Sequence, residues 1–132
     1  MKKFIVLLAI SGSIACLYSF TSISLGDPWV VPDKYLKMKN PVKADATCIN
    51  AGKALYVKHC QSCHGKTGKG DGTKAATLDT EPGDFSSKTF KSQTDGSLFY
   101  KTQTGRKDMP SFKNKIPDEG DLWSVVNYLR TF

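Results

Sequence analysis

The chain has 132 residues, of which 39% are hydrophobic and 23% are charged, proportions typical of one modest folded domain with some additional chain. Its formal net charge is +7, but the lysines are scattered and form no basic stripe interleaved with aromatic residues, which argues against nucleic-acid binding. A domain this small buries a limited share of its surface, so a cofactor or a cross-link would help to stabilise it.

Residues 1–26 have the pattern of an export signal. Lys2 and Lys3 precede an apolar run over residues 4–10, and no further charge appears until Asp27. The pattern predicts export to the periplasm with cleavage of the leader. Two other fates stay open: the uncharged stretch is long enough to remain as a membrane anchor, and the residues around Cys16 distantly resemble a lipoprotein box.

Residues 27–44 contain three prolines and show neither helical nor strand periodicity. We expect an extended linker that lies across the domain, with Trp29 and Val30 packing on it.

Residues 45–132 are expected to form the compact domain. Its first helix is predicted over residues 49–60, with Leu55 and Tyr56 on the inner face. A glycine-rich loop follows over residues 65–72, where regular structure is not expected.

Two further helices are expected, and no strand pattern is convincing. Residues 97–104 are predicted to be helical, with Ser97 as the N-terminal cap. Residues 118–132 begin with three acidic residues, which the helix dipole favours at that end. The apolar residues expected to pack from these two helices are Leu98, Tyr100, Leu122, Val125, Val126 and Leu129. The domain is therefore predicted to be all-α, with long loops.

The chemistry is expected at Cys60, Cys63 and His64, which form a Cys-x-x-Cys-His motif. Two thiols at this spacing can form thioethers with the two vinyl groups of one haem, and the adjacent histidine can bind its iron. A thiol-disulfide redox motif usually lies in a strand-rich unit, and a zinc site requires four ligands. A simple disulfide would leave His64 without a role. Covalent attachment of haem c is the favoured interpretation.

The second axial position of the iron has several candidate ligands. His59 is too close to the attachment turn to reach the opposite face, Met38 lies among lysines, and Met1 belongs to the leader. Met109 lies between two predicted helices, and a thioether suits haem iron and raises its reduction potential. Methionines more often fill gaps in a core. Met109 is the favoured ligand.

The stretch from Cys48 to Phe132 resembles a class I monohaem c-type cytochrome. The resemblance depends on the attachment motif with its glycine-rich continuation, on Gly105-Arg106 before Met109-Pro110, and on the C-terminal helix. It implies a small all-α cytochrome c fold around one covalent haem, with His64 as proximal and Met109 as distal ligand. It also implies that the first and last helices cross at Gly52, close to Tyr128. Cys48 departs from the family pattern as an unpaired thiol, and is expected to be functionally silent.

With both axial positions filled, no coordination site would remain for a substrate, so we expect a one-electron carrier and not an enzyme. Three alternatives stay open. The chain could be a haem subunit of a larger oxidoreductase complex, an open-site haem enzyme or gas-binding protein, or a purely structural haem domain.

Two groups of lysines are expected to border the exposed haem edge. They are Lys66, Lys69 and Lys74 after the attachment turn, and Lys107, Lys113 and Lys115 around Met109. Such a ring favours a redox partner protein with an acidic docking surface, although scattered lysines can also serve solubility alone.

Overall fold

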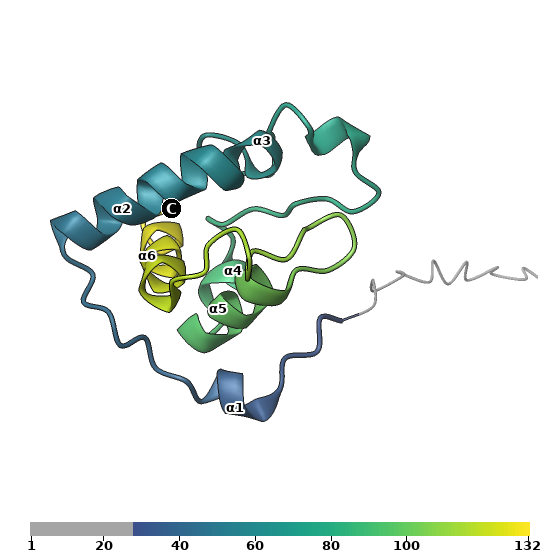
Figure 1. Cartoon of the computed structure of the whole chain (residues 1–132). Coiled ribbons are helices and arrows are strands. Elements are labelled where there is room, and N and C mark those ends of the chain that lie inside the picture. Colours follow the sequence, from purple (N-terminus) through teal and green to yellow (C-terminus); the bar gives the residue numbers. More distant parts are fainter. Residues whose placement is uncertain (1–27) are drawn as a thin grey trace, which may run out of the picture.

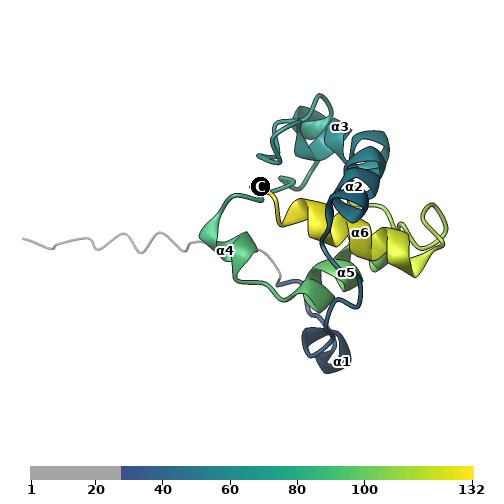
Figure 2. The ribbon, with the colours of Figure 1, turned by 90° about the vertical axis from the view of Figure 1, so that its left-hand side faces the viewer.

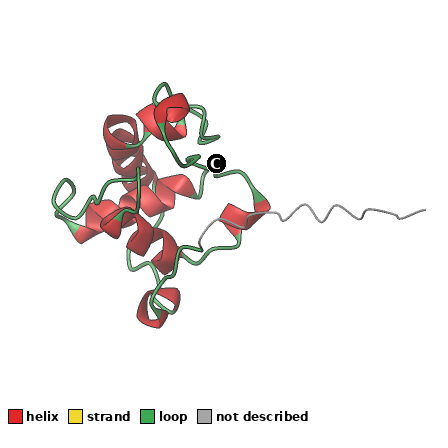
Figure 3. Ribbon diagram, turned by 90° about the vertical axis from the view of Figure 1, so that its right-hand side faces the viewer, coloured by secondary structure: helices red, strands yellow, loops and turns green. Residues whose placement is uncertain are grey.

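The computed structural model describes residues 28–132, which contain helices joined by long loops and no strand (Figure 3). The predicted leader, with its possible membrane anchor and Cys16, lies outside the described residues. No helix within residues 28–132 is long and apolar enough to cross a bilayer. The helices are α1 (Asp33–Leu36), α2 (Ala46–His59), α3 (Gln61–His64), the 3-10 turn η1 (Ala75–Thr77), α4 (Lys88–Lys91), α5 (Asp95–Thr104) and α6 (Glu119–Leu129). The all-α prediction is confirmed.

Side-chain caps set where the three longer helices begin. The Asp45 carboxylate accepts from the Cys48 N–H at 3.0 Å, so α2 begins at Ala46, three residues earlier than predicted. The prediction that Ser97 caps α5 is wrong: the Thr94 hydroxyl accepts from the Ser97 N–H, which places Ser97 inside the helix, 4% exposed. Asp118 caps α6 through the Asp121 N–H.

Helices α2 and α6 cross at Gly52, and this crossing is the centre of the fold (Figures 1 and 2). A Cβ at Gly52 would collide with the Ser124 carbonyl and would lie 3.0 Å from Cβ of Tyr128. The close approach near Tyr128 agrees with the expectation, and the Ser124 backbone is the nearer neighbour. Tyr56, fully buried beside the crossing, packs its ring at 5.3 Å from that of Tyr128.

The apolar face of α6 carries much of the core. Its four predicted core residues are at most 7% exposed: Leu122, Val125, Val126 and Leu129. Trp123 also faces inward, with its ring stacked on Phe99 of α5 at 4.2 Å. Helix α6 is therefore enclosed between α2 and α5.

Residues 28–44 form what we call the N-terminal strap. It is not wholly extended as predicted, because α1 forms one helical turn whose Tyr35 ring packs 4.6 Å from Tyr100 on α5. Further along, Asn127 of α6 accepts a hydrogen bond from Asn40 at 2.8 Å and donates one to the Val42 carbonyl at 3.1 Å. The expectation that Val30 packs on the domain is wrong, since it is 77% exposed.

Candidate functional site

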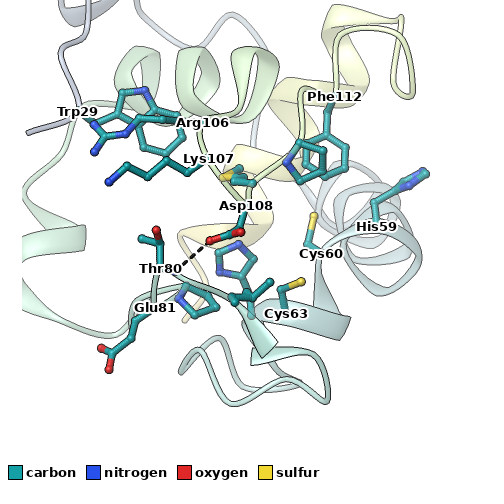
Figure 4. Close-up of a pocket in the computed structure, with 15 residues that line it drawn as sticks. Trp29, His59, Cys60, Cys63, Thr80, Glu81, Arg106, Lys107, Asp108 and Phe112 are labelled. Carbon is teal, nitrogen blue, oxygen red and sulfur yellow. Dashed lines mark hydrogen bonds between the residues drawn. The ribbon is translucent and has the colours of Figure 1, made fainter. Parts of the chain in front are cut away.

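The Cys-x-x-Cys-His motif forms a tight turn at the end of α2. Cys60 ends α2 with its N–H bonded to the Tyr56 carbonyl, and its own carbonyl accepts from the N–H of His64 at 2.9 Å, within α3. Figure 4 shows both cysteine side chains beside one cavity, which Cys60, Cys63 and His64 line together. The structure therefore brings the three motif residues to one site.

The glycine-rich loop folds back under this turn and holds it. The Gly70 N–H donates to the His64 carbonyl at 2.9 Å, and the Gly72 N–H donates to the Cys63 carbonyl at 3.1 Å. Gly70 has a φ of +74°, a conformation that glycine adopts at little cost. On the other side, the Tyr56 hydroxyl donates to the Gly65 carbonyl at 2.6 Å.

His64 has a buried imidazole ring whose surroundings favour its neutral form. Its ring lies on Phe85, with 4.6 Å between centroids, and among the described residues its buried Nδ1 has no hydrogen-bond partner. Burial lowers the pKa of His64 to about 4, and an interaction with the Pro82 backbone opposes this only in part. The ring is consequently neutral at pH 7, the form that can donate a nitrogen lone pair.

Cys60 does not have the lowered pKa of a thiol that exchanges disulfides. Cys60 and Cys63 are free thiols, and burial, with a smaller contribution from Cys63, raises the pKa of Cys60 to about 12. Thiols that exchange disulfides have lowered pKa values. The thiol-disulfide hypothesis is therefore not supported. A zinc site requires a cluster of Cys, His or carboxylate ligands. Within residues 28–132 there is no group of three or more His, Cys, Asp or Glu side chains that could hold a metal ion, so the zinc hypothesis is not supported either.

Met109 lies in a tight loop after α5. Arg106 and Met109 exchange two backbone hydrogen bonds of 2.8 and 3.0 Å, so the chain reverses within four residues. Lys107 takes a φ of +52° in this turn. The half-buried Met109 side chain packs against the core and lines the same cavity as the attachment turn.

Two adjoining cavities of about 270 and 260 Å³ make up the site. They share four lining residues, which are Trp29, His64, Pro82 and Met109. Together the cavities fall in the range of small-molecule sites, about 300–1,000 Å³. Their lining offers two free thiols, a buried imidazole with an unpartnered nitrogen and a thioether, the donor set that haem c uses. The residues present therefore fit a covalently bound haem.

The other sequence candidates are placed differently. His59 contributes to the cavity wall, but its ring packs edge-on against Phe112 at 6.0 Å and points outward in Figure 4. Met38 is 37% exposed on the strap. Cys48 is buried under α6, where its thiol donates to the Ser124 hydroxyl at 3.3 Å and accepts from the Asn127 amide at 3.2 Å.

Several cavity residues had no signal in the sequence. Thr80 and Pro82 follow the glycine-rich loop in a stretch without periodicity, and Phe112 comes from the loop before α6. Trp29 was expected only to pack on the domain, yet it lines both cavities. Their roles come from contacts between segments far apart in the chain, which local patterns do not show.

Comparison with known proteins found one matching family model and several similar solved structures. The model of the family described as cytochrome C oxidase, cbb3-type, subunit III matches residues 48–129. Among solved structures, the Kuenenia stuttgartiensis reducing HAO-like protein complex Kustc0457/Kustc0458 is 25% identical with a TM-score of 0.63, over 81% of this chain and 51% of that one. The chain thus spans about half the length of that relative.

A second similar structure is the KustC0563 c-type cytochrome, which is 24% identical with a TM-score of 0.54 and supports the fold alone. This similarity covers 61% of this chain and 95% of that one. No curated protein is significantly similar to the chain.

Proposed function

The chain belongs to the c-type cytochrome family described as cytochrome C oxidase, cbb3-type, subunit III, and we propose that it is a one-electron carrier with a single haem c. Domains of this family transfer electrons through covalently bound haem. The observation that carries the finer proposal is that Cys60, Cys63, His64 and Met109, from two segments of the chain, line one largely apolar cavity.

In this proposal the two cysteines hold the cofactor and the two other residues bind its iron. Cys60 and Cys63 would form the thioethers, His64 would be the proximal ligand and Met109 the distal one. Haem iron supplies a reversible one-electron couple, whose potential is raised by a thioether ligand. Membership of this family does not by itself identify the two axial ligands of the haem iron. The two backbone hydrogen bonds that close the Met109 loop support a preorganised distal ligand.

The remaining residues exclude water and fix the ligands. Phe85 supports the face of the His64 ring, and Phe112, 4% exposed, closes the cavity beside the cysteines. Two such fixed ligands would leave the metal little freedom to rearrange. The arrangement therefore supports outer-sphere electron transfer and not an enzyme that binds a substrate at the metal.

The partner is proposed to be a redox protein with an acidic docking surface. Lys107 lines the cavity, and Lys115 places its Nζ 5.4 Å from the ring centroid of Phe112 in the cavity wall. Positive charge at the edge of the site would steer an acidic partner.

The second candidate function is that of a haem subunit in a larger oxidoreductase, because the similarity to the solved protein complex covers 81% of this chain. Residues 48–132 make up less than two thirds of the chain. A similarity that covers 81% of the chain therefore also includes residues before position 48.

Cytochrome c domains are typically exported, and the leader pattern of residues 1–26 supports a periplasmic location, with or without a membrane tether. Fractionation of cells that express the full chain, followed by haem staining of soluble and membrane fractions, tests this part of the proposal.

One set of spectra tests the function. The purified full chain should contain one haem per protein that survives denaturation, and the reduced form should not bind carbon monoxide over minutes. Ready binding of carbon monoxide would show an open site and support a haem enzyme or gas-binding protein instead. The absence of covalent haem would contradict the proposal as a whole.

A further inference from the structure

The N-terminal strap is fastened to the domain at two places. Midway along it, the Tyr35 ring of α1 lies 4.6 Å from the Tyr100 ring of α5. Near its end, Asn127 of α6 accepts a hydrogen bond from Asn40 and donates one to the Val42 carbonyl. The residues around and between these contacts are therefore part of the folded domain, and the side chains that they direct outward form a surface of defined position.

The outward side chains of this stretch are basic and apolar. They are those of Lys34, Leu36, Lys37, Met38 and Lys39, and we call them the α1 surface. Leu36 is 42% and Met38 37% exposed, and the three lysines are exposed as well. Within the part of the chain that the structure describes, none of these lysines forms a salt bridge. Lysines beside exposed apolar side chains are typical of segments that lie at a membrane interface.

The charge and the place of the strap in the chain indicate which partner fits the α1 surface. The strap contains four lysines and one acidic residue, Asp33, so the surface is complementary to an anionic partner. Residues 4–26 contain no charged residue and have the pattern of an export signal, and the strap follows them directly. The strap is therefore the described segment that is closest in sequence to the predicted membrane-directed leader, which favours an anionic bilayer over an acidic protein.

The α1 surface and the attachment turn lie at opposite ends of the molecule. Figures 1 and 2 show α1 at one end and α3, which contains Cys63 and His64, at the other. Lys74, at the start of η1, belongs to the end with α3, because its N–H donates to the Ser62 carbonyl at 2.8 Å. A bilayer in contact with α1 would thus leave the attachment turn directed away from the membrane.

We propose that the α1 surface binds an anionic phospholipid bilayer. Lys34, Lys37 and Lys39 contact the phosphates of the headgroups, and the side chains of Leu36 and Met38 enter the interface between them. This contact goes beyond the proposed electron transfer and is separate from the leader. It orients the domain on the membrane, with the attachment turn free to meet a redox partner.

Protection of lysines from acetylation tests the inference whether or not the leader is cleaved. The purified holoprotein, in the form that the host produces, is added to vesicles of phosphatidylcholine, either alone or with an equal part of phosphatidylglycerol. Exposed amines are acetylated with a water-soluble N-hydroxysulfosuccinimide ester. After denaturation, the remaining amines are acetylated with the deuterated reagent. The ratio of the two labels at each lysine, measured by tandem mass spectrometry, gives the rate of acetylation in the folded protein.

Cleavage before aspartate residues supplies both a reporter peptide and a control peptide. The reporter peptide is residues 33–44, which contain all four lysines of the strap. The control peptide is residues 71–78, in which Lys74 is the only lysine. Lys74 is exposed, like the lysines of the α1 surface, so the two peptides differ in their place on the molecule and not in access to the reagent.

Vesicles with phosphatidylglycerol should slow acetylation of Lys34, Lys37 and Lys39 by about fivefold or more, because contact with the phosphates covers their amines. Vesicles of phosphatidylcholine alone should not, and the rate at Lys74 should stay the same with both. Equal rates at the three lysines with both kinds of vesicle would overturn the proposal and favour an acidic protein as the partner. Equal protection of Lys74 would also overturn it, because the whole basic domain and not the α1 surface would then bind the bilayer.

A pair of apolar substitutions separates insertion from charge attraction. Leu36→Asn combined with Met38→Gln keeps all the lysines as reporters and should reduce their protection by about threefold, because less apolar surface enters the interface. Val57→Asn is the matched control, since it removes an apolar side chain that is 52% exposed on α2. Unchanged protection in the double variant would overturn the insertion of Leu36 and Met38. The wild-type measurement requires no variant, so the proposal can be tested even if the double variant fails to fold.

Discussion

Asp108 joins the two sides of the cavity mouth, because its carboxylate accepts a 2.9 Å hydrogen bond from the Thr80 N–H (Figure 4). Asp108 immediately precedes Met109, whereas Thr80 belongs to the segment after η1. This contact fixes the loop that carries the proposed distal ligand.

Loss of that contact should loosen the Met109 loop. We expect Asp108→Ala to increase the rate at which reduced protein binds carbon monoxide by about fivefold, the change expected from one net hydrogen bond. Asp79→Ala, a neighbouring exposed acid, is the control. Absorbance recorded over hours after mixing with carbon monoxide gives the binding rates of the wild type and of both variants, and equal rates in the wild type and in Asp108→Ala would mean that Asp108 does not hold the loop.

The distal ligand can be tested by its removal. Met109→Ala should lower the reduction potential and admit carbon monoxide, because a thioether favours ferrous iron. Met38→Ala, which removes a methionine from the strap, should leave the potential and the carbon monoxide affinity unchanged. Redox titration followed by visible spectra measures the reduction potential, and titration of the reduced protein with carbon monoxide measures the affinity. A wild-type potential in Met109→Ala would point to another ligand.

Covalent attachment depends on both thiols. Cys60→Ala combined with Cys63→Ala should abolish haem staining on a denaturing gel while export continues. Cys48→Ser should retain the stain, because this thiol lies under α6 away from the cavity. The double variant should also unfold at lower temperature, because haem bound to the native state adds to its stability. A stained band in the double variant would contradict the attachment site.

Because α2 and α6 cross at Gly52, an alanine at this position should lower the stability of the protein, the opposite of its effect in an open helix. In an open helix, Gly→Ala stabilises by about 0.5–1 kcal/mol. Here the new methyl group would collide with the Ser124 backbone, so Gly52→Ala should destabilise by about 1–3 kcal/mol. Lys53→Ala, on the exposed side of α2, should stay within about 0.5 kcal/mol of the wild type. Denaturant titration followed by circular dichroism compares them.

The lysines expected around Met109 predict that the rate of electron transfer with the native partner depends on salt. Reversal of Lys107 and Lys113 to glutamate should slow electron transfer most at low ionic strength, because screening weakens steering as salt rises. Lys53→Glu, at an exposed position of α2 that belongs to neither group of lysines expected at the haem edge, should have a smaller effect. Stopped-flow rates across a salt series provide the measurement. A rate that responds to neither salt nor charge reversal would indicate apolar docking or a permanent complex.

The sequence by itself determined the parts of this protein that depend on neighbouring residues. The attachment motif spans five consecutive positions, and the i, i+3, i+4, i+7 spacing in residues 118–132 is contained in one helix, so both could be recognised without tertiary structure. The resemblance to c-type cytochromes and the all-α fold are confirmed. The assignment of Met109 as distal ligand stays a prediction, although the structure places it in the cavity.

Only the tertiary structure decided which distant segments complete the site. Trp29 meets Lys101 and Arg106 across more than 70 residues of chain, and Asp108 meets Thr80 across 28. Nothing local distinguishes these residues, because a solvated tryptophan or aspartate in a loop would have the same sequence surroundings. Their partners are determined by the crossing of α2 with α6 and by the path of the strap over α5, which depend on packing of the whole core.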